Sequence, residues 1–149
     1  MIRIAGLALV MIFFSLLADA QVRRIPAEVT TAFSKQYPQA IEVEYKDQLK
    51  GVTVYFLQDS IKMIARYSND GTWKESEKAT SYEEIPSEIH EGFKKSKYAD
   101  GEWKVTEAAI IFLPGNTERY RVKIEKNELQ KKNLFFEKNG RLVKESLTL

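Results

Sequence analysis

The chain has 149 residues, 44% of them hydrophobic, and a formal net charge of +2. With no cysteine and a single histidine, it can form no disulfide and no thiol nucleophile, and its composition argues against a closed zinc site, which needs four nitrogen or sulfur ligands. The charge is well short of the strongly basic footprint of a nucleic-acid-binding domain. Stability must therefore come from packing.

The first twenty residues predict a cleaved secretory signal peptide. Arg3 gives a positive start, residues 4–17 are almost entirely apolar, and Ala18-Asp19-Ala20 has the form of a cleavage site. The apolar run is shorter than the roughly 20 residues of a membrane-spanning helix. An uncleaved N-terminal anchor is the alternative interpretation. We expect a secreted chain that begins near Gln21 and has no membrane span after cleavage.

An internal repeat organises the rest of the chain. Residues 24–29 (Arg-Ile-Pro-Ala-Glu-Val) and Phe33 recur at the same spacing as residues 84–89 (Glu-Ile-Pro-Ser-Glu-Ile) and Phe93. A repeat of this kind indicates one structural unit used twice. The predicted organisation is a signal peptide over residues 1–20, a first repeat over 21–80 and a second repeat over 81–149.

The first repeat opens on a predicted helix over about residues 26–37. Pro26 suits the first turn of a helix, because its missing N–H needs no partner there. Val29 and Phe33 continue an apolar stripe with helical spacing. Pro38 cannot continue the helical hydrogen bonding and disfavours helical geometry in the preceding residue, so the helix ends there.

Four strands are predicted to follow the first helix, because the apolar period changes to two. Ile41, Val43 and Tyr45 alternate with charged residues and predict a first strand with one buried face. The strands are expected over about 41–46, 52–57, 61–67 and 72–77. Asn69-Asp70-Gly71 is a strong hairpin signal, since these residues tolerate the positive φ of tight turns.

The second repeat has the same predicted order. Ile85, Ile89 and Phe93 form the helical stripe, and Gly101 ends the segment in place of a proline. Strands are expected over about 102–113, 118–126, 129–137 and 141–148. Asn139-Gly140 occupies the position in the second repeat that corresponds to Asp70-Gly71 in the first repeat, the turn before the last strand. The extra residues of the second repeat are expected mostly in its first strand and the following turn.

The predicted fold class is α+β: a tandem repeat of one helix and a four-stranded antiparallel meander. A unit of this size has only a marginal core by itself. We therefore expect the two units to join edge to edge into one continuous eight-stranded sheet with both helices on one face, in preference to two independent domains. That arrangement buries the inner edges and leaves the other face of the sheet open to water or to a partner.

Three motifs resemble a known family. They are the repeated Ile-Pro-x-Glu helix start, Lys-Gln-Tyr-Pro-Gln-Ala at residues 35–40, and Asn-Asp-Gly-Thr-Trp at residues 69–73. Together they resemble the PepSY-like, β-lactamase-inhibitor-like proteins of Bacteroidetes-type bacteria over residues 24–149. The second repeat departs from the pattern, since Tyr98-Ala99 lacks the proline of the family.

The resemblance implies a location and a shape. It implies a periplasmic protein, secreted across the inner membrane, with the helix-plus-four-strand fold of the secreted β-lactamase inhibitor in tandem. It does not imply inhibition of a β-lactamase, because the sequence contains no inhibitory-loop motif.

The residues needed for catalysis do not cluster in the sequence. His90 falls on the polar side of the second helix, where we expect an exposed residue instead of a buried and oriented catalytic histidine. Glu42 and Glu44 read as a solvated strand face, and the carboxylates of residues 83–88 suit a helix N-terminus. No calcium-binding loop motif occurs. The sequence predicts no catalytic residue, no metal, no cofactor and no enzyme activity.

The strongest surface signal lies on the predicted open face of the sheet. Basic side chains alternate with apolar ones in the strand over 118–126, and the first repeat offers aromatic, aliphatic and arginine side chains. This composition is enriched at protein–protein contacts. The predicted binding residues are Tyr55, Ile64, Arg66, Trp73, Arg119, Arg121 and Lys123. In the alternative interpretation the basic residues only keep the sheet soluble and Trp73 sits in the core.

The sequence thus favours a non-catalytic periplasmic binding module. Its open face would contact a protein, peptide or envelope component, with inhibition of a hydrolase as a special case. The alternative function is a structural or self-associating protein, a homodimer with the apolar run over 108–113 as its expected seam. The expected partners are an unknown periplasmic protein or peptide, or a second copy, and not nucleic acid.

Overall fold

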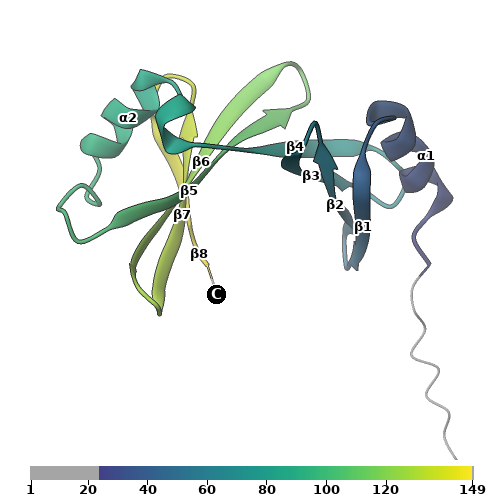
Figure 1. Ribbon diagram of the computed structural model, residues 1–149, viewed down its shortest axis with the longest axis horizontal. Coiled ribbons are helices and arrows are strands. Elements are labelled where there is room, and N and C mark those ends of the chain that lie inside the picture. The colour runs from purple at the N-terminus through teal and green to yellow at the C-terminus, as the bar shows by residue number, and fades with distance from the viewer. Residues whose placement is uncertain (1–23, 149) are drawn as a thin grey trace, which may run out of the picture.

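The computed structural model describes residues 24–148, so the predicted signal peptide lies outside the described residues. One helix and four strands occur twice along the chain (Figure 1). The first set is α1 (Ala27–Gln36), β1 (Ile41–Gln48), β2 (Gly51–Gln58), β3 (Ile61–Tyr67) and β4 (Trp73–Thr80). The second set is η1 (Tyr82–Glu84), α2 (Ser87–Lys94), β5 (Lys104–Leu113), β6 (Thr117–Asn127), β7 (Gln130–Glu137) and β8 (Leu142–Leu147). The predicted α+β class is confirmed.

A proline starts each helix as predicted, but it is the N-cap residue directly before the helix and not a residue of the first turn. Pro26 precedes α1 with φ −57°, and Pro86 precedes α2 with φ −56°. The buried positions of the two helices include Val29 and Phe33 in α1 and Ile89 in α2. The repeated Ile-Pro-x-Glu sequence therefore positions a helix on the sheet.

The eight strands form one antiparallel sheet in the order β1 to β8. The two halves of the chain meet at the β4–β5 ladder, where Ser76 pairs with Phe112 and Glu77 pairs with Ile111. This pairing buries the inner edge of each half and confirms one continuous eight-stranded sheet.

Both helices lie on one face of the sheet. Met63, Lys78, Ile110 and Tyr120 are successive cross-strand neighbours, so their side chains point to the same face. Met63 belongs to the apolar cluster that contains α1 residues, and Tyr120 belongs to the cluster that contains α2 residues. Figure 1 shows the helices on the outer side of an arched sheet. We call the opposite face the open face.

Each half has its own apolar core. The core of the first half consists of Val29, Phe33, Val52, Val54, Phe56, Met63, Ala65 and Tyr67. The core of the second half consists of Ile85, Ile89, Tyr98, Ala108, Tyr120, Val122, Ile124, Leu134 and Phe136. The two clusters share no residue, so the halves are joined through the sheet instead of through a common core.

A glycine turn in each half packs against the helix. Gly71 in the β3–β4 turn has φ +80°, and Gly140 in the β7–β8 turn has φ +82°. A Cβ atom at Gly71 would lie 2.7 Å from the carbonyl oxygen of Glu28, and one at Gly140 would lie 2.1 Å from that of Glu88. These glycines are thus required both for the turn conformation and for the close approach of the hairpin to the helix.

The first strand differs from its prediction. Ile41 is 57% exposed and Val43 37%, whereas Tyr45 packs against the first core. A bulge between Ile41 and Glu44, with Glu42 at φ +52°, interrupts the alternation. A bulge twists an edge strand and hinders pairing with another chain, so the irregularity protects this open edge.

The extra residues of the second repeat lie only partly in the first strand and following turn, where they were predicted. The segment between α2 and β5 spans residues 95–103, whereas only residues 37–40 separate α1 from β1. Strand β5 has 10 residues and β6 has 11, against 8 in each of β1 and β2. The insertion is therefore shared between this connection and the two strands.

The hydrogen bonds of the β3–β4 turn lead to a testable prediction about the pKa of Asp70. The hydroxyl of Ser68 donates a hydrogen bond of 2.5 Å to Asp70, and the backbone N–H of Thr72 donates one of 3.0 Å. These bonds lower the pKa of Asp70 to about 2, with the Ser68 bond as the largest cause. Because the folded pKa lies below the ordinary value of 3.8, the stabilisation is present above that value and is lost as the pH falls towards 2.

Replacing Ser68 with alanine should raise the pKa of Asp70 towards its ordinary value. Carboxyl ¹³C chemical shifts followed during an acid titration would measure it. An unchanged pKa in the variant would show that the hydroxyl does not stabilise the carboxylate.

Candidate functional site

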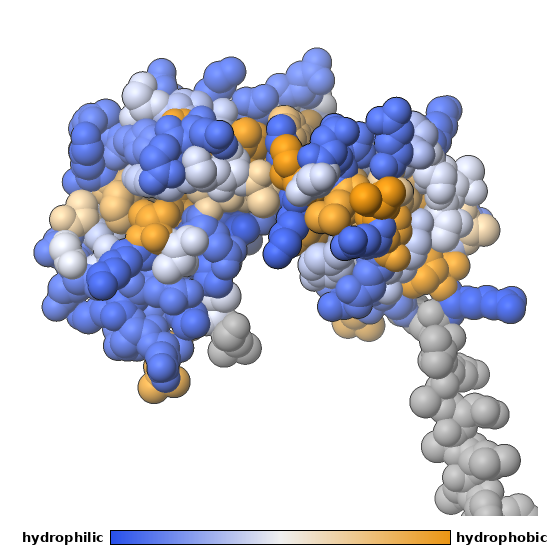
Figure 2. All heavy atoms as spheres, viewed as in Figure 1, coloured by the Kyte–Doolittle hydropathy of each residue, from blue (hydrophilic) through white to orange (hydrophobic). Residues whose placement is uncertain are grey.

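The open face forms a groove of about 610 Å³ that crosses both halves of the molecule. From the first half, Tyr55, Ile64, Arg66, Glu75 and Glu77 line it. From the second half, the groove is lined chiefly by Ile111, Leu113, Arg119, Arg121, Phe135 and Lys144. Figure 2 shows the molecule as an arch hollowed between its two halves. We call this surface the groove.

Strand alternation explains why these side chains share a face. In β2, residues Val54 and Phe56 enter the core under α1, so Tyr55 between them points to the groove. Tyr55 pairs with Ile64, and Glu77 with Ile111, which continue as neighbours across the sheet. A single row of side chains therefore runs from the first half into the second.

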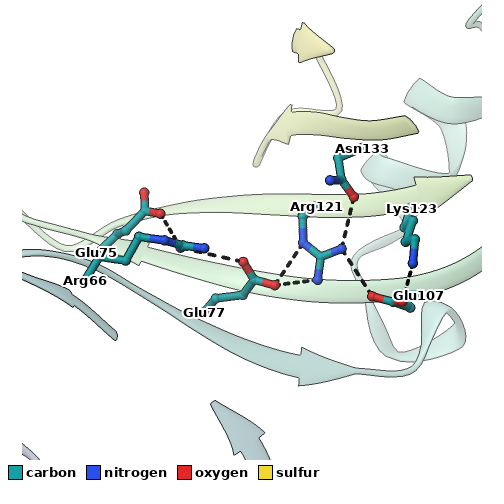
Figure 3. Close-up of polar contacts among 7 residues, drawn as sticks. All are labelled: Arg66, Glu75, Glu77, Glu107, Arg121, Lys123 and Asn133. Atoms are coloured by element: carbon teal, nitrogen blue, oxygen red, sulfur yellow. Dashed lines mark hydrogen bonds and ion pairs between the residues drawn. The ribbon is translucent and has the colours of Figure 1, made fainter. Parts of the chain in front are cut away.

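A buried ion pair at the bottom of the groove joins the halves. The side chains of Glu77 in β4 and Arg121 in β6 are 8% and 14% exposed. Arg121 donates hydrogen bonds to Glu77 from Nε, at 2.8 Å, and from a terminal nitrogen. Its other terminal nitrogen donates to Asn133 Oδ1 at 3.2 Å and lies 3.5 Å from Glu107 Oε2 (Figure 3). The buried charges thus satisfy each other.

Further ion pairs extend this network in both directions (Figure 3). Arg66 donates to Glu75 at 2.6 Å and lies 3.9 Å from Glu77. Lys123 donates to Glu107 at 2.7 Å. This hydrogen bond is the largest cause that lowers the pKa of Glu107 and raises the pKa of Lys123. The network holds both carboxylates and cations in fixed positions on the open face.

Five of the seven predicted binding residues line the groove. They are Tyr55, Ile64, Arg66, Arg119 and Arg121. Lys123 lies on the same face beyond the groove, paired with Glu107. Two of the three basic side chains predicted on β6, Arg121 and Lys123, are therefore neutralised by carboxylates. The third, Arg119, makes no side-chain hydrogen bond or ion pair with another residue of the described range 24–148.

Trp73 lies on the helix side, not on the predicted open face. Its indole packs against the first core, and its Nε1–H donates to the Ser76 hydroxyl oxygen at 2.8 Å. The cause is a bulge between β3 and β4: Arg66 pairs with Glu75, but Tyr67 pairs with Trp73. One extra residue in a strand moves the next side chain to the other face.

The sequence interpretation missed the acidic partners of the arginines and the groove residues of β5, β7 and β8. Glu75 and Glu77 alternate with Ser76, which is a visible signal for a shared face. Which cation each carboxylate meets depends on strand register, and the pattern of one strand does not fix its register with the next.

The apolar run over 108–113 is not available as a dimer seam. It lies in β5, which pairs with β4 on one side and β6 on the other. Ala108, Ala109 and Ile111 are buried within the chain. The run is apolar because it forms the centre of the sheet.

His90 is half-buried instead of exposed as predicted. One ring nitrogen lies 3.2 Å from the carbonyl oxygen of Ile85, and the ring packs at 4.4 Å against that of Tyr82. These contacts tie η1 to α2. Within residues 24–148, no group of three or more histidine, aspartate or glutamate side chains is placed to hold a metal ion.

Comparisons with solved structures identify the architecture. A BLIP-like protein of Bacteroides fragilis superposes with a TM-score of 0.71 at 20% identity, covering 87% of this chain and 92% of that one. The chain has the BLIP-like fold. A DUF2874 family protein of Bacteroides uniformis superposes on this chain with a TM-score of 0.72 at 20% identity, covering 82% of this chain and 88% of that one. A Bacteroides eggerthii protein predicted to be periplasmic reaches 0.72 at 17% identity, with coverage of 83% and 89%.

These likenesses concern the fold. No protein-family model matches the sequence, and a search of curated proteins finds no match. In the described part of the chain, no helix is both long and apolar enough to cross a membrane.

Proposed function

We propose that this chain is a non-catalytic periplasmic binding module that holds a segment of a partner protein or peptide in the groove. The observation that carries the proposal is the groove itself, a concave surface of aromatic, aliphatic and arginine side chains built from both halves. Aromatic and arginine side chains carry much of the binding energy of protein–protein contacts, and apolar side chains fill the core of such interfaces.

The ion network supports binding by holding the groove in one shape. Arg66 and Arg121 are engaged by Glu75 and Glu77, so these side chains are already ordered before a partner arrives. A preordered surface loses less conformational entropy on association. The groove also keeps apolar area open to solvent between the charged groups, at Ile64 among others. Burial of that area would drive the contact.

The BLIP-like fold is consistent with a non-catalytic binding role, and the PepSY-like resemblance implies a periplasmic location. A name that refers to an inhibitor belongs to the similar protein, and inhibition of a secreted hydrolase enters here only as one form of the proposed binding. The predicted signal peptide and the periplasmic description of one similar protein support a periplasmic location.

Photo-crosslinking in the bacterium that encodes the chain tests this function. A benzoylphenylalanine residue is introduced at Tyr55 or at Leu113 in the groove, and at Leu129 as a control. Leu129 lies in the β6–β7 turn and is 93% exposed, away from the groove. We expect a discrete adduct with one partner from both groove positions and none from Leu129, measured by mass spectrometry.

Two outcomes would contradict the proposal. Equal adducts from the groove positions and from Leu129 would show nonspecific contact, and the lack of any adduct from Tyr55 and Leu113 would remove the groove as a binding site. An adduct with the mass of two chains would assign the groove to self-association, the alternative function. Light scattering of the purified protein would then show a dimer.

A further inference from the structure

We infer that the segment held in the groove is acidic: a protein segment with a carboxylate beside an apolar side chain, received by Arg119 and Lys144. This inference rests on the proposed function and specifies the chemistry of the partner.

The carboxylates that line the groove are already occupied. Glu75 accepts from Arg66 at 2.6 Å, and Glu77 accepts two hydrogen bonds from Arg121. These acidic groups therefore do not offer a free anion to a basic ligand. A cationic segment would meet carboxylates whose charge is already balanced by arginines, and displacing Arg121 from Glu77 would leave a buried charge unpaired, which is costly.

Two cations of the groove have no carboxylate partner within residues 24–148. Arg119 is exposed and stands opposite Glu137 in the β6–β7 ladder, but Glu137 is held by Arg141, with contacts down to 2.8 Å. Lys144 is exposed, and its Nζ lies 5.3 Å from the ring centroid of Phe135. Both cations can therefore bind an external anion without breaking an ion pair within the protein.

The charges of the side chains that line the groove also favour an acidic ligand. Four cationic side chains face two carboxylates along the groove, so a positive excess remains after the internal pairs are formed. Concave surfaces focus such a field and attract ligands of opposite charge. The planar guanidinium of Arg119 also suits two parallel hydrogen bonds to one carboxylate.

The apolar neighbours of Arg119 favour a protein segment over an acidic polysaccharide or a lipid headgroup. Ile64 and Leu113 line the same groove as Arg119, and both are half-buried, so each keeps apolar area open to a ligand. Aliphatic side chains here would pack against an aliphatic or aromatic side chain of the segment. A sugar polymer or a phosphate group carries no aliphatic or aromatic side chain that could pack in this way.

Fluorescence anisotropy with labelled synthetic peptides tests the inference on the purified secreted protein. The probes are a short peptide of repeating Glu-Leu-Gly and its counterparts with Gln or Lys in place of Glu. We expect the Glu peptide to bind most tightly, with an affinity that falls as salt is raised. The double variant Arg119→Gln/Lys144→Gln should weaken this binding about tenfold.

The matched control is Lys35→Gln/Lys138→Gln. It removes the same charge from two exposed positions outside the groove, one at the end of α1 and one in the β7–β8 turn. It should leave the affinity for the Glu peptide unchanged. Four outcomes would overturn the inference. The control could lose as much affinity for the Glu peptide as the groove variant, or the Gln peptide could bind as tightly as the Glu peptide. The Lys peptide could bind more tightly than the Glu peptide, or the Glu peptide could fail to bind at all.

The crosslinking experiment separates this inference from the function on which it rests. If Tyr55 still gives its adduct in full yield in the Arg119→Gln/Lys144→Gln variant, the binding function stands and the acidic-segment inference is wrong. If that yield falls while the Lys35→Gln/Lys138→Gln control keeps it, both are supported.

Discussion

Replacement of Arg121 by methionine should lower the free energy of unfolding by about 3 kcal/mol, the cost of leaving a buried charge without its partner. Methionine keeps much of the apolar stem but removes the guanidinium that holds Glu77, whose side chain is only 8% exposed. Arg66, at 3.9 Å from Glu77, is too distant to replace the lost hydrogen bonds. Urea unfolding followed by circular dichroism would measure the change.

The matched control for this prediction is Arg119→Met. Arg119 is exposed and unpaired within residues 24–148, so its loss should change stability by no more than about 0.5 kcal/mol. In the Arg121→Met background, Glu77→Gln should recover part of the loss because it removes the unpaired charge. Equal stability of the Arg121→Met and Arg119→Met variants would show that the buried pair does not hold the halves together.

Replacement of Gly140 by alanine should destabilise the protein by about 3 kcal/mol. A residue with a Cβ is strained at φ +82°, which costs about 1–2 kcal/mol. The added atom would also lie 2.1 Å from the carbonyl oxygen of Glu88, so the β7–β8 hairpin must move away from α2. Thermal unfolding and the loss of amide protection in α2 would report both effects.

Gly115→Ala separates the two causes. Gly115 has φ +79°, but a Cβ there would meet nothing within 4 Å. This variant should therefore show only the conformational cost, about 1–2 kcal/mol. Gly71→Ala should resemble Gly140→Ala, because its Cβ would lie 2.7 Å from the Glu28 carbonyl oxygen. If Gly140→Ala were no worse than Gly115→Ala, the close approach of turn and helix would contribute nothing.

Most of the fold could be predicted because the local signals agree with one another. Proline starts each helix, the period changes from helix to strand after it, and the glycine turns end the third strand of each half. The repeat then indicates that the halves are equivalent. The first strand was harder, because the bulge at Glu42 leaves the sequence pattern unchanged while turning Ile41 and Val43 to solvent.

The sequence could predict on which face of the sheet the site residues lie, but not which charged side chains pair with each other. Alternation placed Tyr55, Ile64 and Arg66 on the open face, and the structure places them in the groove. Trp73 lies two residues before Glu75, so regular alternation would put both side chains on the same face. Only the bulge places Trp73 on the helix side. The second half repeats this device, since Phe135 pairs with Lys144 and Phe136 with Leu142. Such shifts, like the Glu77–Arg121 pairing, depend on register between strands.

The separation of the two apolar cores has a consequence for the order in which the protein folds. Within each half, every strand pairs with its neighbour in sequence, so only short loops must close. The β4–β5 ladder instead brings Ser76 to Phe112 across the whole of α2 and its connections. Closure of longer loops costs more entropy and slows folding. We therefore expect each half to assemble around its own core first, and the groove to come into existence only with the last and slowest pairing.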